Sequence, residues 1–367
     1  MNRTRICLQF ALGLAIFVTA LALPAQAQTA GAPKMENARV EQRAISGNLA
    51  QTVDAWAKSA EHPQWMAYAV PAVSSDHQVC CGGNWDGNRC GPCRLEGSDH
   101  GSDFNLRGDK VQLEGPQRLL VLFRAAGRKI GKVRVVSEDC TLDAAGLQIV
   151  WLGAANPAES VKFLERFVDS KELDERGGER LSRGALTAIA LHGDPAADQA
   201  IAGFVSLDQP ESMRREAAFW AGEARGAAGV QLLKRMAKAD PSPEVRAHVT
   251  FALSMSRESN AVDEMIRMAH EDASGHVRGQ ALFWLAQKAG QKASATITSA
   301  IDNDPDTEVK KKAVFALSQM PKDDGVPKLI QVAENNRNPE VRKQAMFWLG
   351  QSNDPRALEF FEKVLSK

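Results

Sequence analysis

Apolar residues in the second half of the chain recur with the spacing of an amphipathic helix, and the whole pattern then repeats. Val341, Ala345 and Leu349 follow one another four positions apart, which places them on one face of a helix. The stretch that contains them recurs at one fixed interval, which equally spaced phenylalanines mark: Phe219, Phe251, Phe283, Phe315 and Phe347. A fixed period of this kind is typical of a solenoid in which each repeat is one supersecondary unit.

Each repeat contains the signals that begin a helix. Ser242-Pro243-Glu244 and Asn338-Pro339-Glu340 combine an N-cap side chain with proline at the first helical position. A second apolar helix follows a turn, as at Val230, Leu233 and Ala237. One helix pair cannot bury its apolar face alone, so we expect neighbouring pairs to stack around one continuous core.

The repeated segment has a recognisable form at its first helix. Asp240-Pro241 is followed by Val245-Arg246, and the same valine and basic residue recur at Val277-Arg278, Val309-Lys310 and Val341-Arg342. Earlier, less regular copies begin at Met213-Arg214 and Leu181-Ser182. These residues resemble the HEAT-repeat family, whose first helix reads Asp-Pro-x-x-Val-Arg-x-x-Ala-x-x-Ala-Leu-Gly, including the short bacterial form found in phycobilin lyases.

The resemblance covers about residues 171–367 and implies an all-α solenoid of six HEAT-like helix pairs. It does not imply an activity, because similar repeats occur in many proteins that are not enzymes. Asn156-Pro157 begins one further helix, which we expect to cap the first repeat, so we place the solenoid at residues 156–367.

Strand-forming sequence precedes the repeats. The apolar runs 119–123 and 132–136 flank Gly127-Arg128-Lys129 as a β-hairpin, and residues 147–152 supply a third strand. We therefore expect a small, cysteine-containing β-rich unit at residues 65–152. Before it, at 28–64, we expect a flexible leader with one short helix, because most of that segment is small, polar and unpatterned.

Residues 1–27 have the order of a secretory signal peptide. Arg3 and Arg5 precede an apolar run that ends at an Ala25-Gln26-Ala27 site, so we expect cleavage after Ala27 and a periplasmic or secreted protein. The alternative is an uncleaved membrane anchor. No second apolar run is long enough to span a bilayer, so we expect no membrane insertion after cleavage.

The charge balance argues against a nucleic-acid partner. Lysine and arginine total 45, and aspartate and glutamate also total 45, so no net field would draw the protein to a polyanion.

Four cysteines within a short glycine-rich segment are the sharpest chemical signal. Cys80 and Cys81 precede Cys90 and Cys93, and an oxidising compartment favours two disulfides joining the pairs, with Cys140 as a spare thiol or a further partner. Zinc is the alternative, for which Cys90-x-x-Cys93 has suitable spacing. Cys-Gly-Pro-Cys is also the thioredoxin tetrapeptide, although no βαβ pattern surrounds it here.

Two charged columns follow the repeat. We interpret them as a structural ladder between loops, since a catalytic group is not normally copied in successive repeats. The columns are Asp208, Asp240, Asp272 and Asp304, with Arg214, Arg246, Arg278 and Arg342.

An aromatic column points away from the expected core. Its position in the first helix lies about 240° around from the leading valine, among polar neighbours. It suits a stripe that binds a partner protein; alternatively, the rings pack sideways on adjacent repeats, or the β unit covers them. Tryptophan occurs in alternate repeats, which suggests a double unit made of two successive repeats. The column comprises Phe219, Trp220, Phe251, Phe283, Trp284, Phe315, Phe347 and Trp348.

The sequence therefore favours an exported scaffold that binds another protein through its repeats, without a cofactor and without a catalytic constellation. The alternative is a thiol–disulfide or metal-dependent enzyme centred on residues 80–93, with the solenoid as a docking arm.

Overall fold

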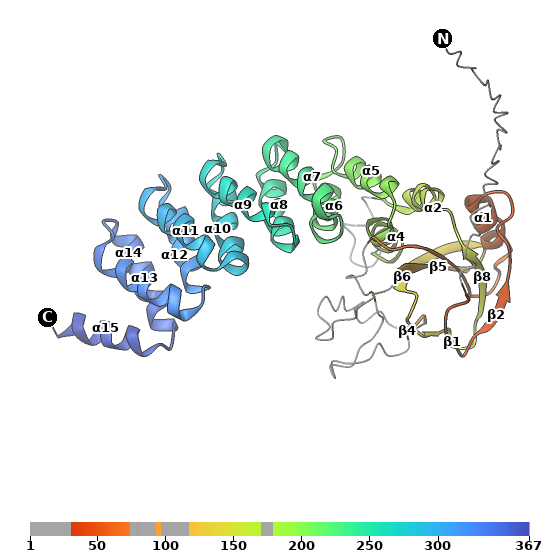
Figure 1. The fold of residues 1–367 in the computed structure, drawn as a ribbon, viewed down its shortest axis with the longest axis horizontal. Coiled ribbons are helices and arrows are strands. Elements are labelled where there is room, and N and C mark those ends of the chain that lie inside the picture. Colours follow the sequence, from red (N-terminus) through yellow and green to blue (C-terminus); the bar gives the residue numbers. More distant parts are fainter. Residues whose placement is uncertain (1–30, 74–78, 80–92, 97–116, 170–178, 367) are drawn as a thin grey trace, which may run out of the picture.

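A computed structural model describes residues 31–73, 79, 93–96, 117–169 and 179–366. A mixed β unit is followed by an elongated array of helix pairs, which extends away from the sheet to the C-terminus (Figure 1). This is the predicted fold class.

A five-stranded sheet forms the centre of the β unit. Its order is β2-β8-β3-β5-β6, with parallel pairing of β8 to both β2 and β3 and antiparallel pairing from β3 through β6. The strands are β2 (Arg39–Gln42), β3 (Gln64–Pro71), β5 (Arg118–Ala126), β6 (Lys129–Ser137) and β8 (Gln148–Ala154).

The predicted hairpin and third strand are confirmed. β5 and β6 are joined by Gly127 and Arg128, which both have positive φ, at 58° and 64°. This is the two-residue turn that matches the twist of paired strands. β3 was not predicted, because it is buried on both faces and so has no alternation of apolar and polar residues.

A smaller sheet lies against one face of the larger one. It has the order β1-β7-β4, with parallel pairs, and shares a second apolar core with Trp65 and Trp151. Its strands are β1 (Met35–Glu36), β4 (Cys93–Arg94) and β7 (Leu142–Asp143).

The prediction of a flexible leader is wrong for most of its described part. Residues 35–42 contribute β1 and β2, whose backbone groups pair with strands far along the chain, such as Arg39 with Gln148. Short polar strands of this kind are held by non-local hydrogen bonds and have no local pattern. The short helix that was predicted in the same segment is present as α1 (Leu49–Ser59), capped by the Asn48 side chain.

The array begins with α2 (Pro157–Leu164), capped by Asn156 as predicted, and a 3-10 turn η1 (Glu165–Phe167). Six helix pairs follow in the described residues, and we call the first and second helix of each pair helix A and helix B. The pairs, numbered as repeats 1 to 6, are α4 (Glu179–Leu191) and α5 (Pro195–Phe204); α6 (Glu211–Ala224) and α7 (Gly226–Ala239); α8 (Pro243–Met255) and α9 (Asn260–Glu271); α10 (Gly275–Ala289) and α11 (Gln291–Asn303); α12 (Thr307–Ser318) and α13 (Lys322–Asn335); α14 (Pro339–Gln351) and α15 (Pro355–Leu365).

The first repeat docks directly on the sheet. At Gly184 of α4, an added Cβ would lie 2.1 Å from the Val133 carbonyl oxygen of β6, so only glycine permits this approach. One continuous cluster of buried apolar side chains then runs from Leu49 of α1 to Phe360 of α15. The β unit and the array therefore share a core.

A buried chain of hydrogen bonds also joins the two parts. Tyr68 Oη lies 2.7 Å from Ser160 Oγ, which lies 2.8 Å from His192 Nε2, while His192 Nδ1 donates to the Ala188 carbonyl. In a neutral imidazole with its proton on Nδ1, Nε2 accepts from the Ser160 hydroxyl. Burial lowers the pKa of His192 to about 4, which keeps the ring neutral at ordinary pH.

In the part of the chain that the structure describes, no helix combines the length and apolar character needed to cross a bilayer.

Candidate functional site

The aromatic column forms one continuous ladder of rings along the A helices. Successive ring centroids lie between 4.8 and 6.0 Å apart, within the range of favourable aromatic contacts. We call this set the aromatic ladder; in contact order it is Trp220, Phe219, Phe251, Trp284, Phe283, Phe315, Trp348 and Phe347.

The contacts of the aromatic ladder follow the double unit that the sequence suggests. Phe219 stacks on Phe251 and Phe283 stacks on Phe315, with interplanar angles of 15° and 5°. Between these pairs, Phe251 and Phe315 instead meet the tryptophan of the next repeat at 4.8 Å in a tilted contact. Stacked and tilted contacts alternate, so the structural period is two repeats.

The rings of the aromatic column pack against one another inside the array, and one ring at its end is exposed. Inside the array, the rings pack sideways on the neighbouring A helices and are half-buried, as Phe251, Phe283 and Phe315 show. Phe347 in the last repeat contacts only one other ladder ring, Trp348, and its side chain is 54% exposed. Among the described residues, the sheet packs against α4, which precedes the first ladder ring, so it does not cover the ladder.

Exposed apolar side chains concentrate near this end. The described residues expose six large apolar side chains, and four of them belong to repeat 6. Large contiguous apolar patches on a folded protein mark interaction sites, whereas single exposed apolar side chains are common. The four are Phe347, Leu358, Val364 and Leu365.

The charged columns form a ladder of ion pairs between repeats. Arg246 donates to both carboxylate oxygens of Asp272 in the next repeat, at 2.8 and 3.0 Å, and to the Asp240 carbonyl of its own repeat. Arg214 with Asp240 and Arg278 with Asp304 repeat the bidentate contact. Each aspartate also accepts from the backbone N–H two residues later, which holds its loop.

The electrostatics agree with a structural role. Burial alone would raise the pKa of Asp272, but hydrogen bonds from Arg246 and the Ser274 amide outweigh it and lower that pKa. The carboxylate is therefore ionised and paired at any ordinary pH. A bidentate pair of this type fixes two loops relative to each other.

The ion-pair ladder stops at both ends of the array. Asp208 is exposed, and Ser182 stands where its arginine would be. Toward the C-terminus, Lys310 and Asn336 replace the arginine and aspartate, and Arg342 donates only to carbonyls of its own loop among the described residues. These positions of the predicted ladder therefore have no ion pair of this kind.

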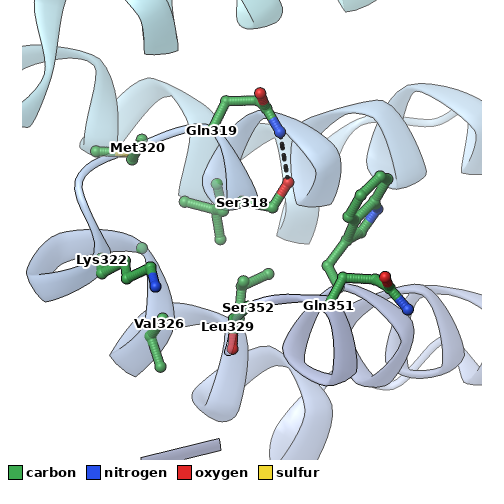
Figure 2. A pocket seen from close by; sticks show the side chains of 11 residues that line it. Ser318, Gln319, Met320, Lys322, Val326, Leu329, Gln351 and Ser352 are labelled. Atoms are coloured by element: carbon green, nitrogen blue, oxygen red, sulfur yellow. Dashed lines mark hydrogen bonds between the residues drawn. The ribbon is translucent and has the colours of Figure 1, made fainter. Parts of the chain in front are cut away.

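A pocket of about 230 Å³ opens between repeats 5 and 6. Figure 2 shows Met320, Lys322, Val326 and Leu329 from the turn and helix B of repeat 5, facing Gln351 and Ser352 at the end of α14. Trp348 of the aromatic ladder also lines it, and its indole N–H is buried without an acceptor among the described residues.

No pattern in the sequence predicted this pocket. Its signal is the exchange of Lys288 for Ser352, two positions that correspond to each other one double unit apart. The loss of a long side chain at one position is visible only when the sequences of two successive double units, rather than of single repeats, are aligned.

Most of the cysteine cluster, namely Cys80, Cys81 and Cys90, lies outside the described residues. Cys93 is buried in β4 and is disulfide-bonded. Cys140 is buried in the same core, where its thiol donates to the Val79 carbonyl at 3.3 Å. The described residues contain no group of three or more side chains that could hold a metal ion.

The comparisons with known proteins concern the helical array. The family described as HEAT repeats matches residues 198–286 and 294–367. No curated protein matched the chain.

Several solved structures are similar to part of this chain. Human deoxyhypusine hydroxylase matches at 15% identity and TM-score 0.28, over 56% of this chain and 90% of its own. The CpcE–CpcF complex of phycocyanin lyase from Nostoc sp. PCC7120 matches at 17% identity and TM-score 0.30, over 56% and 80%. The karyopherin Kap121p, bound to the SUMO protease Ulp1p, matches at 14% identity and TM-score 0.37, over 57% and 27%. The family match and the geometry agree that residues 198–367 are an array of HEAT repeats, set behind a mixed β unit.

Proposed function

We propose that this protein is an exported scaffold that binds another protein through the end of its HEAT array around repeat 6. The observation that supports this most strongly is that Phe347, the last ring of the aromatic ladder, is 54% exposed. Aromatic side chains are enriched in the buried centres of protein interfaces.

The shape of the array favours a partner of macromolecular size. Stacked repeats present an extended surface rather than a closed cleft, and binding is their usual role. Internal ladder rings are half-buried against one another, so a partner that docks on Phe347 meets a rigid surface that is already ordered. Pre-ordered surfaces bind with less loss of conformational entropy.

Export is part of the proposal. Its support is the basic, apolar and small-residue order of residues 1–27. Cell fractionation and N-terminal sequencing test it: we expect the mature chain in the exported fraction, beginning at Gln28. An intact N-terminus in the cytoplasmic fraction would refute export.

Capture of a partner tests the binding role. Tagged wild-type protein, Phe347→Ser and Gln231→Ser are each purified from their own compartment under identical conditions. Gln231 is an exposed residue of α7 on helix B, so its variant is a matched surface control. We expect one protein to copurify with the wild type and the control but not with Phe347→Ser. Equal recovery with all three would refute the proposed surface.

The enzyme alternative has its own test. Thiol–disulfide exchange requires an accessible sulfur, whereas Cys93 is fully buried. We expect the purified protein to show no disulfide reductase activity beyond that of its Cys90→Ser, Cys93→Ser variant. Reductase activity that disappears in this variant, with the fold retained, would favour the enzyme.

A further inference from the structure

The pocket between repeats 5 and 6 has a counterpart one double unit earlier, between repeats 3 and 4. Several residues that line the pocket are identical at the corresponding positions of the counterpart. The pairs are Leu253 and Leu317, Ser254 and Ser318, Val262 and Val326, Trp284 and Trp348, and Gln287 and Gln351.

One backbone hydrogen bond and one ring contact also match. The Ser256 N–H donates to the Leu253 carbonyl at 3.3 Å, and the Met320 N–H donates to the Leu317 carbonyl at 3.2 Å. The tryptophan of each place meets the phenylalanine of the preceding repeat at the same 4.8 Å. The two places therefore share this hydrogen bond and this ring contact, although their turns differ in length: α8 ends at Met255 and α9 begins at Asn260, whereas α12 ends at Ser318 and α13 begins at Lys322.

The earlier place is filled by a lysine side chain. Lys288 lies one helical turn after Trp284, and its Nζ donates to the carbonyl oxygens of Ser254 and Ser256, at 2.7 and 2.5 Å. These carbonyls lie at the C-terminal end of α8, where the helix dipole favours a positive charge. The aminobutyl chain thus satisfies two backbone acceptors that helix geometry leaves open.

The later place lacks this side chain, because position 352 is serine. The corresponding carbonyl oxygens belong to Ser318, the last residue of α12, and Met320, and neither accepts a hydrogen bond from another described residue. The cavity of about 230 Å³ remains, walled by Leu317, Leu329 and Trp348.

We propose that this pocket receives the aminobutyl side chain of a lysine from the partner protein. Its methylenes lie along the Trp348 side of the pocket, and its ammonium donates to the Ser318 and Met320 carbonyls, as Lys288 does one double unit earlier. That the lysine belongs to a partner protein rests on the proposed function. Binding of an alkyl ammonium group in the pocket does not rest on it. The pocket also shares Trp348 with the exposed end of the aromatic ladder, so one partner can engage both.

One residue at the pocket opposes the charge of this ligand. Lys322 is exposed and lines the pocket at the position where repeat 3 has Glu258. Its positive charge weakens the attraction for a second ammonium. Binding of a free lysine is therefore weak, and Lys322→Glu, which introduces the carboxylate that Glu258 has at the corresponding position, tightens it severalfold.

The test uses the mature full-length protein and the indole N–H resonance of Trp348, assigned with Trp348→Phe. The probe is Nα-acetyl-lysine amide; Nα-acetyl-norleucine amide lacks only the ammonium, and hexanoate is an alkyl chain of similar length that carries a carboxylate. We expect a saturable shift with the lysine probe alone. Ser352→Lys fills the pocket from within and should weaken that binding at least tenfold.

The counterpart supplies an internal control. In the Ser352→Lys protein both places are filled by a lysine of the chain itself, whereas adding Lys288→Ser to it empties only the earlier place. Butylammonium should therefore raise the melting temperature of the double variant but not that of Ser352→Lys alone. If the double variant does not fold, the comparison of the wild type with Ser352→Lys decides.

Three results overturn the proposal: no shift with the lysine probe, equal shifts with the norleucine probe, or a shift with hexanoate instead. Because no partner is needed, failure of the pocket is separate from failure of the scaffold role. If amine binding holds and Phe347→Ser still captures the partner, the pocket stands and the proposed surface fails.

Discussion

The aromatic ladder predicts very different costs for removing a ring from its middle and from its end. Phe283 is half-buried and contacts two rings, Phe315 at 5.7 Å and Trp284 at 4.9 Å. Truncating a fully buried phenylalanine costs about 3–5 kcal/mol, and each aromatic pair contributes about 0.5–1.5 kcal/mol. For a half-buried ring with two such contacts, we expect Phe283→Ser to lower the free energy of unfolding by about 2–3 kcal/mol.

Phe347 is the matched control at the same position of the repeat. It is 54% exposed and contacts one ladder ring, at 5.0 Å, so we expect Phe347→Ser to cost less than about 1 kcal/mol. Thermal unfolding followed by circular dichroism compares the two. A loss of about 2–3 kcal/mol corresponds to a decrease of about 5–10 °C in melting temperature for an array of this size.

The comparison has a clear refutation. If both variants melt within a degree or two of the wild type, the rings do not pack between repeats. The aromatic column would then be an exposed stripe along its whole length, and the assignment of binding to the last repeat would lose its basis.

Three further predictions concern the ion pairs, the buried histidines and the docking of the first repeat. Asp272→Asn leaves Arg246, whose side chain is 14% exposed, without its carboxylate partner, so we expect the free energy of unfolding in urea to fall by about 3 kcal/mol. Asp208→Asn, at an exposed position, should leave it unchanged. Equal effects of the two substitutions would contradict the ion-pair ladder. Burial lowers the pKa of His192 and of His248 to about 4, below their ordinary value of 6.5, so on acidification the unfolded chain binds these protons before the folded protein does. The free energy of unfolding should therefore be constant above pH 6.5 and fall by up to about 1.4 kcal/mol per pH unit per histidine as the pH decreases toward 5. A urea midpoint that does not change across this pH range would refute the burial of the two histidines. Gly184→Ala forces α4 away from the Val133 carbonyl and should lower the melting temperature by several degrees, whereas Gly350→Ala, where an added Cβ meets nothing within 4 Å, should not; an unchanged Gly184→Ala protein would contradict the close docking.

The repeat was readable from sequence because its energetics are local and copied. Val341, Ala345 and Leu349 mark the same buried stripe in each A helix, and Asn338 or Ser242 marks where the helix begins. The double unit was visible as well, in the alternation of tryptophan with small residues. These features depend on contacts within one helical turn or between repeats at a fixed sequence separation, so they are visible in the sequence.

The β unit was less predictable because long-range pairing decides it. β5 and β6 form a local hairpin and were found, whereas β2 depends on β8, and β3 is buried on both faces and therefore shows no alternation. The hydrogen-bonded Tyr68, Ser160 and His192 come from three distant elements, so no spacing in the sequence relates them. The pocket beside Ser352 arises from the absence of a side chain, which a pattern of present residues does not reveal.

Site-specific photo-crosslinking in the living cell tests the central claim most directly. A photoreactive phenylalanine analogue is placed at Phe347 and, as a control, at Gln231 on helix B. The account predicts a covalent adduct with one protein at position 347 and none at position 231. An adduct at position 231 with none at position 347 would contradict it, because the partner would then bind the opposite helix layer and not the exposed end of the aromatic ladder.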